Sequence, residues 1–183
     1  MKPNILFIII DAFRADRCFG KYKTSKTPNI DFLIKNGISF EQAFTSADGT
    51  EVSMSSIFTA LHPFKATIRG GIWHTKLSTE KTIISLMKEF GYHAYQTIHL
   101  MWNTKFFDFG FDNYDKGYEG FQNLSTGVGD MILKKIDPKK MKEPWIYYIH
   151  LMDLHKPISV PKKFNDEKYG KDDYDKMISV VDI

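Results

Sequence analysis

The sequence predicts an α/β fold, a mostly parallel sheet flanked by helices on both faces. Strand-like apolar runs alternate along most of the chain with segments whose apolar residues recur at helical spacing. The chain has 183 residues, and its composition, 43% hydrophobic and 26% charged, is that of a globular protein with a real core. No repeat, low-complexity segment or interdomain linker interrupts it. We therefore expect residues 1–183 to belong to a single α/β domain.

The first element is the apolar run at residues 5–10, which ends in a single carboxylate, Asp11. Such a run predicts a strand buried on both faces. Ligands of open α/β sheets bind beyond the carboxyl ends of the strands, where a carboxylate can coordinate a metal. The alternative is that Asp11 merely caps a loop or a helix.

Capping and periodicity predict the later elements. A helix opens at Thr27-Pro28, because proline suits the first helical position, and ends at Asn36-Gly37. Another begins at Ser78, a candidate N-cap, and stops at Phe90-Gly91. The remaining elements are strands at residues 38–44, 92–100 and 145–152, and helices at residues 53–61, 129–136 and 172–183.

Charge and cysteine content limit the function classes. The 25 basic and 22 acidic residues leave a net charge of +3, which is too balanced to indicate nucleic-acid binding. The only cysteine, Cys18, excludes an intrachain disulfide and fits a reducing compartment. The N-terminal apolar run is too short to span a membrane and lacks a cleavage site, so we expect no membrane span, no signal peptide and a cytoplasmic protein.

Polar side chains follow the predicted strands. Asp11, Thr50 and the pair Asp153 and His155 come just after strands, and His99 lies near the end of another. The carboxyl ends of parallel strands meet at one edge of a sheet. We therefore expect these groups to converge on an active site.

Thr50 follows a turn and precedes a helical segment, so it is expected at or just before a helix N-terminus. Backbone N–H groups there favour an anion such as phosphate or sulfate. A threonine hydroxyl needs a base or a metal to become a nucleophile. The alternative is that Thr50 is simply an N-cap. His150 falls within an apolar pattern and is expected in the core, whereas His155 is expected in a loop.

Several motifs keep an order and spacing that cover nearly the whole chain. They are the opening strand with Asp11 and then Phe13-Arg14-Ala15-Asp16, the helix start Thr27-Pro28-Asn29-Ile30-Asp31, Gly37-Ile38-Ser39-Phe40, the helix from Thr50 to Pro63, Phe90-Gly91-Tyr92, and the histidine loop at residues 149–157. In these motifs the sequence resembles the sulfatase-like hydrolases of the alkaline phosphatase superfamily.

The departures from that pattern are informative. Thr50 stands where sulfatases carry the cysteine that becomes formylglycine, and Met54 replaces an arginine. Ala12 replaces a second aspartate and Thr97 a lysine, although His99 is kept. A threonine nucleophile is similar to that of the superfamily's phosphodiesterases and phosphotransferases, which use two metals.

The resemblance implies a metal-dependent hydrolase or transferase of phosphate or sulfate esters. Thr50 would attack, Asp11 and Thr50 would bind a divalent metal, with zinc ahead of calcium or manganese, and His99 and His155 would contact the ester. The substrate would be a small-molecule, glycan or lipid ester. The alternative is a catalytically inactive binding or assembly module that keeps the sulfatase fold.

The family's Asp-His-Gly motif is expected beyond the last predicted helix, in which the chain stops at Ile183. We therefore expect an N-terminal portion of a sulfatase-like domain, truncated at the C-terminus and inactive as the 183-residue chain alone. A sheet without its remaining strands would expose an edge that invites self-association.

Overall fold

The computed structural model describes residues 2–69, 75–77, 81–102, 108–112, 117–137 and 139–183. The chain divides into two compact units. Unit 1 comprises Met1–Ile9, Phe44–Glu119 and Lys134–His150, and unit 2 comprises Ile10–Ala43, Gly120–Leu133 and Leu151–Ile183.

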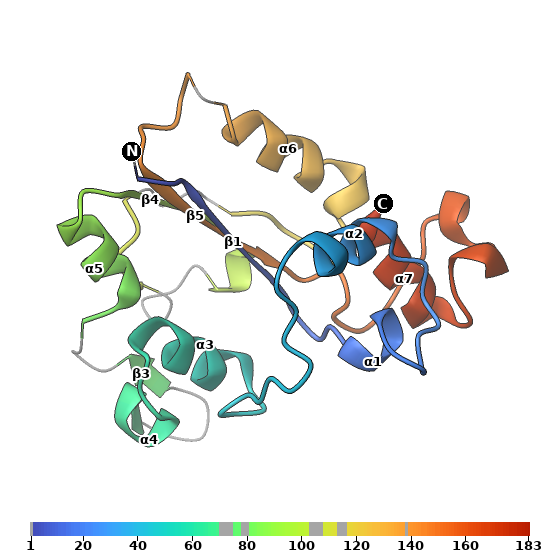
Figure 1. The fold of residues 1–183 in the computed structure, drawn as a ribbon, viewed down its shortest axis with the longest axis horizontal. Helices are drawn as coiled ribbons and strands as arrows, with labels where there is room; N and C mark the ends of the chain where they lie inside the picture. The colour runs from blue at the N-terminus through green and yellow to red at the C-terminus, as the bar shows by residue number, and fades with distance from the viewer. Residues whose placement is uncertain (1, 70–74, 78–80, 103–107, 113–116, 138) are drawn as a thin grey trace. The chain divides into compact units, whose positions relative to one another are not determined.

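Strands and helices are interspersed along the chain, with four helices in succession between β1 and β2 (Figure 1). The strands are β1 (Ile5–Ile10), β2 (Thr67–Arg69), β3 (Thr75–Leu77), β4 (His93–Thr97) and β5 (Trp145–Leu151). The α-helices are α1 (Ala15–Cys18), α2 (Pro28–Asn36), α3 (Thr50–Thr59), α4 (Pro63–Ala66), α5 (Ile83–Glu89), α6 (Val128–Lys135) and α7 (Asp173–Asp182). Short 3-10 helices are η1 (Leu100–Trp102), η3 (Leu124–Thr126), η4 (Lys162–Phe164) and η5 (Glu167–Tyr169). Among the described residues, no helix combines the length and the apolar character that a membrane crossing requires.

The main sheet has the strand order β1-β5-β4. Strands β4 and β5 are parallel, with His93 opposite Trp145 and Thr97 opposite Ile149. This confirms the predicted α/β fold with a parallel sheet. A second, antiparallel pair, β2 and β3, was not expected from the sequence.

In unit 1 the two faces of the sheet have different neighbours. Phe58 of α3 and Ile84 of α5 belong to the same buried cluster as Ala94 of β4 and Tyr148 of β5. These strand residues alternate with those of the opposite face. There Lys135, the last residue of α6, donates a hydrogen bond to Thr97 Oγ1 at 3.1 Å. Helices thus contact both faces of the sheet.

Strand β1 differs from the expected strand buried on both faces. Ile5, Phe7 and Ile9 pack against the buried cluster of unit 1, but Leu6 and Ile8 are each 47% exposed. Strand β1 is also the end strand of the described sheet, with a strand neighbour on one side only. The prediction of two-sided burial was wrong for this strand.

The predicted strand at residues 38–44 is also wrong. These residues form no strand, and the side chains of Ile38, Phe40 and Phe44 are 85%, 77% and 91% exposed. Alternation describes a side-chain pattern, but a strand also needs a neighbour to satisfy its backbone. Thr50 consequently follows a loop and not a strand.

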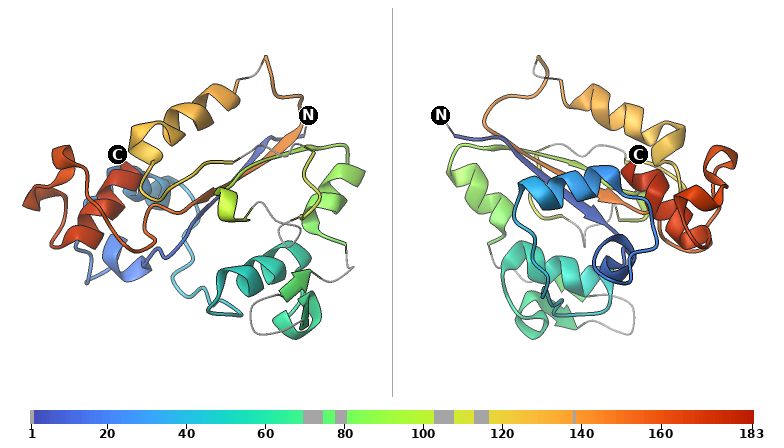
Figure 2. Two further views of the ribbon diagram at one scale, coloured as in Figure 1. Left: turned by 180° about the vertical axis from the view of Figure 1, so that it is seen from behind. Right: turned by 45° about the vertical axis from the view of Figure 1, so that its right-hand side comes forward.

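Unit 2 is built around α2 and α7, which lie side by side in both figures (Figures 1 and 2). The Asp182 carboxylate of α7 accepts from the backbone N–H groups of Asn29 and Ile30 at 2.9 and 2.7 Å, which caps the first turn of α2. Asp172 caps α7 by accepting from the N–H of Asp175 at 2.9 Å. The bounds of both helices agree with the sequence prediction.

The start of α5 differs from the prediction. Ser78 lies outside the described residues, and the helix begins only at Ile83. Its N-cap is Thr82, whose hydroxyl accepts from Ser85 N–H at 3.1 Å and donates to Phe109 O at 2.7 Å. Two bonds from one buried hydroxyl fix this boundary, so the prediction of Ser78 as the cap was wrong.

Candidate functional site

Two of the predicted site residues, Asp11 and His155, belong to unit 2. Asp11 directly follows β1, and its N–H donates to Leu151 O at 2.8 Å, at the end of β5. His155 lies in the turn after β5, where its N–H donates to Met152 O at 3.0 Å. Both residues therefore lie beyond the carboxyl ends of their strands, where ligands of α/β sheets bind.

The hydrogen bond of His155 defines which nitrogen of its imidazole carries the proton. Its Nδ1 lies 2.9 Å from Lys156 O, and a carbonyl only accepts, so Nδ1 donates. In the neutral ring, Nε2 then carries the lone pair. The ring of Phe121 lies 4.7 Å from that of His155 and restricts its orientation. Nε2 can therefore accept a proton or bind a cation.

Asp153, two residues before His155, is fully buried. Its Oδ1 accepts from Leu124 N–H at 2.9 Å, while Oδ2 has no hydrogen-bond partner among the described residues. Burial raises the pKa of the Asp153 carboxyl, against the opposing effect of the Leu124 hydrogen bond. The hydrogen bond from Leu124 N–H ties the turn that carries Asp153 and His155 to the start of η3.

Thr50 belongs to unit 1 and is the first residue of α3. The N-cap is Gly49, which has no side chain to bind the first-turn N–H groups, and Ser53 N–H donates to Gly49 O at 2.9 Å. The alternative that Thr50 is the N-cap is therefore wrong. Thr50 is half-buried and lies at the positive end of a ten-residue helix, which favours anions.

His99, also in unit 1, follows β4 and is 8% exposed. Its Nδ1 accepts from Met101 N–H at 3.1 Å, and its ring meets Tyr118 edge-on at 5.3 Å. Since Nδ1 accepts, the neutral ring carries its proton on Nε2. His99 is thus arranged to donate through Nε2, and His155 to accept.

His150 is a core residue, as predicted. It is fully buried, and its Nδ1 lies 2.7 Å from Tyr148 OH. Its carbonyl accepts from Tyr118 OH at 2.7 Å.

Two of the positions that depart from the family pattern in unit 1, Met54 and Thr97, are buried. Met54 is 2% exposed and belongs to the buried core cluster. Thr97 is fully buried and shares hydrogen bonds with Tyr147 OH at 2.7 Å and with Lys135 Nζ at 3.1 Å. Burial lowers the pKa of Lys135. An ammonium from α6 therefore lies beside the position where the family has a lysine, and no local sequence signal indicates this contact.

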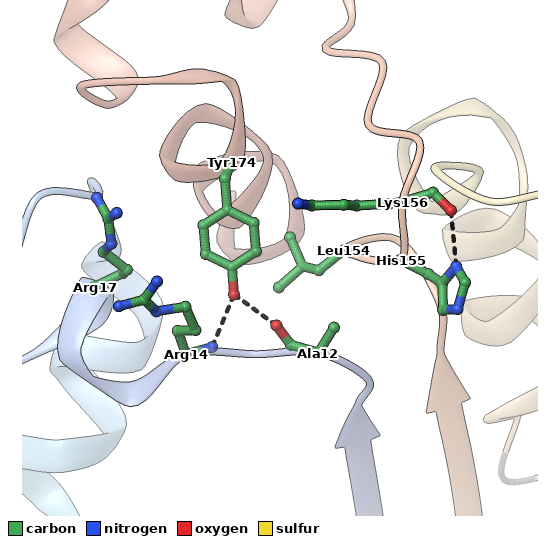
Figure 3. A pocket seen from close by; sticks show the side chains of 7 residues that line it. All are labelled: Ala12, Arg14, Arg17, Leu154, His155, Lys156 and Tyr174. Carbon is green, nitrogen blue, oxygen red and sulfur yellow. Dashed lines mark hydrogen bonds between the residues drawn. The ribbon is translucent and has the colours of Figure 1, made fainter. Parts of the chain in front are cut away.

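Unit 2 contains a pocket of about 490 Å³ at the end of β1 (Figure 3). It is lined by Ala12, Arg14, Arg17, Leu154, His155, Lys156 and Tyr174. The Tyr174 hydroxyl donates to Ala12 O at 2.6 Å and accepts from Arg14 N–H at 2.9 Å. Ala12 is held with a φ of 55°, a left-handed conformation that is uncommon for a residue with a Cβ. The tyrosine of α7 thus fixes the loop that follows Asp11.

The two arginines of the pocket have different partners. Arg14 forms a bidentate pair with Asp16, at 3.0 Å from Nε and 2.8 Å from Nη2, and both side chains are about half exposed. This hydrogen bond lowers the pKa of Asp16. Arg17 reaches the fully buried carboxylate of Asp175 at 3.3 Å. Arg17 is therefore committed to the fold, whereas Arg14 has an exposed partner that it can exchange.

Metal-ligating side chains do not gather in the described part of the chain. No group of three His, Cys, Asp or Glu residues lies close enough to hold an ion there. Catalytic zinc usually takes three protein ligands, and calcium about six to eight oxygens. Asp11 alone does not fit either metal, so the described residues do not make a complete site.

Comparison with known proteins agrees with this architecture. The family model for sulfatases matches residues 3–182. An arylsulfatase of Clostridium perfringens is 34% identical over 96 residues, which are 51% of this chain and 20% of that protein.

Two solved structures resemble the fold. The complex of Ps i-CgsB with k-i-k-neocarrahexaose has a TM-score of 0.73 at 21% identity, over all of this chain and 53% of that one. The phosphonate monoester hydrolase of Agrobacterium radiobacter has a TM-score of 0.67 at 14% identity, over 91% of this chain and 44% of that one. The chain thus spans about half the length of these structures, and its match covers about a fifth of the arylsulfatase. With a family match over nearly its whole length, the chain belongs to the sulfatase family.

Proposed function

We propose that the intact protein hydrolyses or transfers phosphate or sulfate esters with Thr50 as its nucleophile. The position of Thr50 carries this proposal. It is the first residue of α3, at the end of the helix that favours anions, and it stands where sulfatases carry their nucleophile. In this proposal a bond forms between Thr50 Oγ1 and the phosphorus or sulfur atom, and the bond to the leaving oxygen breaks.

The two histidines take different roles in the proposal. His99 Nε2 donates a hydrogen bond to an ester oxygen or to the departing oxygen, because its Nδ1 is occupied by the Met101 N–H. His155 Nε2 accepts, because its Nδ1 donates to Lys156 O. Opposite proton assignments suit a donor and an acceptor in one reaction.

Phosphate esters are the preferred substrates in this proposal. A covalent threonine sulfate lacks the elimination route that the geminal diol of formylglycine provides. A phosphothreonine can be hydrolysed by attack of water on phosphorus. The structural likeness to a phosphonate monoester hydrolase agrees with this preference, and the arylsulfatase relative keeps sulfate esters as the second substrate class.

A divalent metal is part of the proposal, since sulfatase-family proteins generally use one. Asp11 and Thr50 would be ligands, with zinc ahead of calcium or manganese. The described residues do not complete such a site, so further ligands must come from other residues of the intact protein. The metal would supply Lewis-acid stabilisation of the ester oxygens. We also propose a cytoplasmic location, because the lone Cys18 fits a reducing compartment.

The test is turnover by the complete gene product on aryl phosphate, aryl phosphodiester and aryl sulfate esters, with zinc, calcium or manganese added. Thr50→Ala is expected to lower kcat by at least about 10³-fold, because it removes the hydroxyl that forms the covalent intermediate. Thr59→Ala, at the other end of the same helix, is the matched control. Full turnover by Thr50→Ala would show that another group attacks.

A second candidate is a binding or assembly module without chemistry. Met54 favours it, because a buried apolar side chain occupies the place of the family's arginine. Failure of all three ester classes with all three metals, while the protein remains folded, would favour this candidate.

A further inference from the structure

The pocket at the end of β1 has charged walls of one sign. Arg14, Arg17 and Lys156 line it together with His155, and no carboxylate among the described residues does. Among the described residues, the Lys156 ammonium forms no ion pair. Figure 3 shows that this ammonium points toward Tyr174. A volume of about 490 Å³ lies within the range of roughly 300–1,000 Å³ that small ligands occupy.

The pocket is also preorganised. Tyr174 OH holds both Ala12 O and Arg14 N–H, so the loop that carries Arg14 is fixed before any ligand arrives. The Arg17 pair with Asp175 anchors α1 to α7 on the same side. Fixed walls reduce the ordering cost of binding.

The pocket adjoins the predicted reaction residues of unit 2. His155 is itself part of the wall, and Ala12 follows Asp11 directly. A molecule bound through His155 can therefore extend a second group into the pocket. This second group would face Lys156 and Arg14.

We propose that this pocket binds a second anionic group of the substrate, a sulfate, phosphate or carboxylate separate from the ester that reacts. The inference rests on the proposed ester-hydrolase function and names the substrate class, a polyanionic ester. Lys156 is the primary cation of the subsite. Arg14 becomes the second cation that contacts the anion when its side chain releases Asp16. Arg17 stays paired with Asp175 and attracts the anion only through its positive charge.

The binding test uses the 183-residue chain, with inorganic sulfate and inorganic phosphate as probes. Titration is followed by the amide signals of Ala12 and Lys156 in two-dimensional NMR. Saturable binding is expected, and Lys156→Ala and Arg14→Ala should each weaken it roughly fivefold or more, since each removes a charge-assisted hydrogen bond. Asp16→Asn should tighten binding, because it removes the carboxylate that competes for Arg14.

Lys21→Ala is the matched control, an exposed lysine of unit 2 that does not line the pocket. Lys156→Arg keeps the charge and should retain most of the affinity. Absence of saturable binding would overturn the proposal. An equal loss of anion affinity in Lys21→Ala and Lys156→Ala would overturn the proposal too, because binding would then depend only on the overall charge of the protein.

A second arm distinguishes a substrate group from a free inorganic anion. In the complete gene product, the KM of an aryl ester is compared with that of the same ester bearing a ring carboxylate. The ester with the ring carboxylate should have the lower KM. Lys156→Ala should abolish the difference in KM between the two esters, and Lys21→Ala should keep it. Anion binding without any effect of the carboxylate on KM would overturn the substrate role. If neither ester is turned over, the proposed function fails, while the binding arm still decides whether the pocket holds an anion.

Discussion

Truncation of Phe58 tests the packing that holds the α3 helix, and with it Thr50. Phe58 is fully buried, and four aromatic rings surround it with centroids 4.1 to 6.1 Å away, those of Phe7, Phe109, Phe111 and Tyr148. Core Phe→Ala changes cost about 3–5 kcal/mol, and the cost depends on how far the site collapses. Four ring neighbours cannot all move into one cavity, so we expect Phe58→Ala to lose about 4 kcal/mol of unfolding free energy.

The assay is urea unfolding of the 183-residue chain, followed by circular dichroism. Phe64→Ala is the matched control, because Phe64 of α4 is 76% exposed, and its loss should stay within about 0.5 kcal/mol. Phe58→Leu keeps part of the volume and should lose about 1–2 kcal/mol, which provides a measurement if the alanine variant does not fold. A loss below about 1 kcal/mol in Phe58→Ala would refute the assigned packing.

Four further predictions concern other parts of the chain. The raised pKa of Asp153 means that the folded state keeps its proton above about pH 4 while the unfolded state loses it. Stability should therefore fall as pH rises from about 4, by at most about 1.4 kcal/mol per unit, and Asp153→Asn should remove this decline in urea unfolding. Identical pH profiles of the two proteins would contradict the assignment. Thr82→Ala removes a cap and leaves a buried carbonyl without its donor, so it should cost about 2 kcal/mol, whereas Thr82→Ser should cost much less. Calorimetric titration with zinc or calcium should find binding on the order of millimolar at best, and a micromolar site that vanishes in Asp11→Asn would reveal missing ligands. Ile8→Lys should lower any self-association seen by sedimentation, because Ile8 is 47% exposed on the end strand of the described sheet, and an unchanged dimer fraction would exclude this edge.

Local sequence signals predicted a helix correctly where the residues that cap it are adjacent to it in the sequence. The proline at the first position of α2 and the Asp172 cap of α7 lie next to the helices that they define. The apolar runs of β1 and β5 predicted strands for a different reason, because a short continuous apolar run is typical of a buried strand. Segment 38–44 failed because a strand is defined by its neighbour, and alternation alone supplies none.

Long-range contacts could not be predicted from the sequence. Tyr174 contacts the loop at Ala12 across 162 positions, and Lys135 reaches Thr97 across 38. The cap of α5 was misplaced because the bond from Thr82 to Phe109 O is invisible in a local pattern. The roles of the predicted site residues stay predictions, since they concern a reaction and not a fold.

The most direct test of the proposed function is mass spectrometry of the complete gene product after acid quenching of a reaction with an aryl phosphate and added zinc. We predict a phosphoryl group on the peptide that contains Thr50 in the unchanged protein and in the control Thr59→Ala, and no such group in Thr50→Ala. A phosphoryl group on any other residue would contradict the assignment of Thr50 as the nucleophile. Full turnover by Thr50→Ala would contradict it as well.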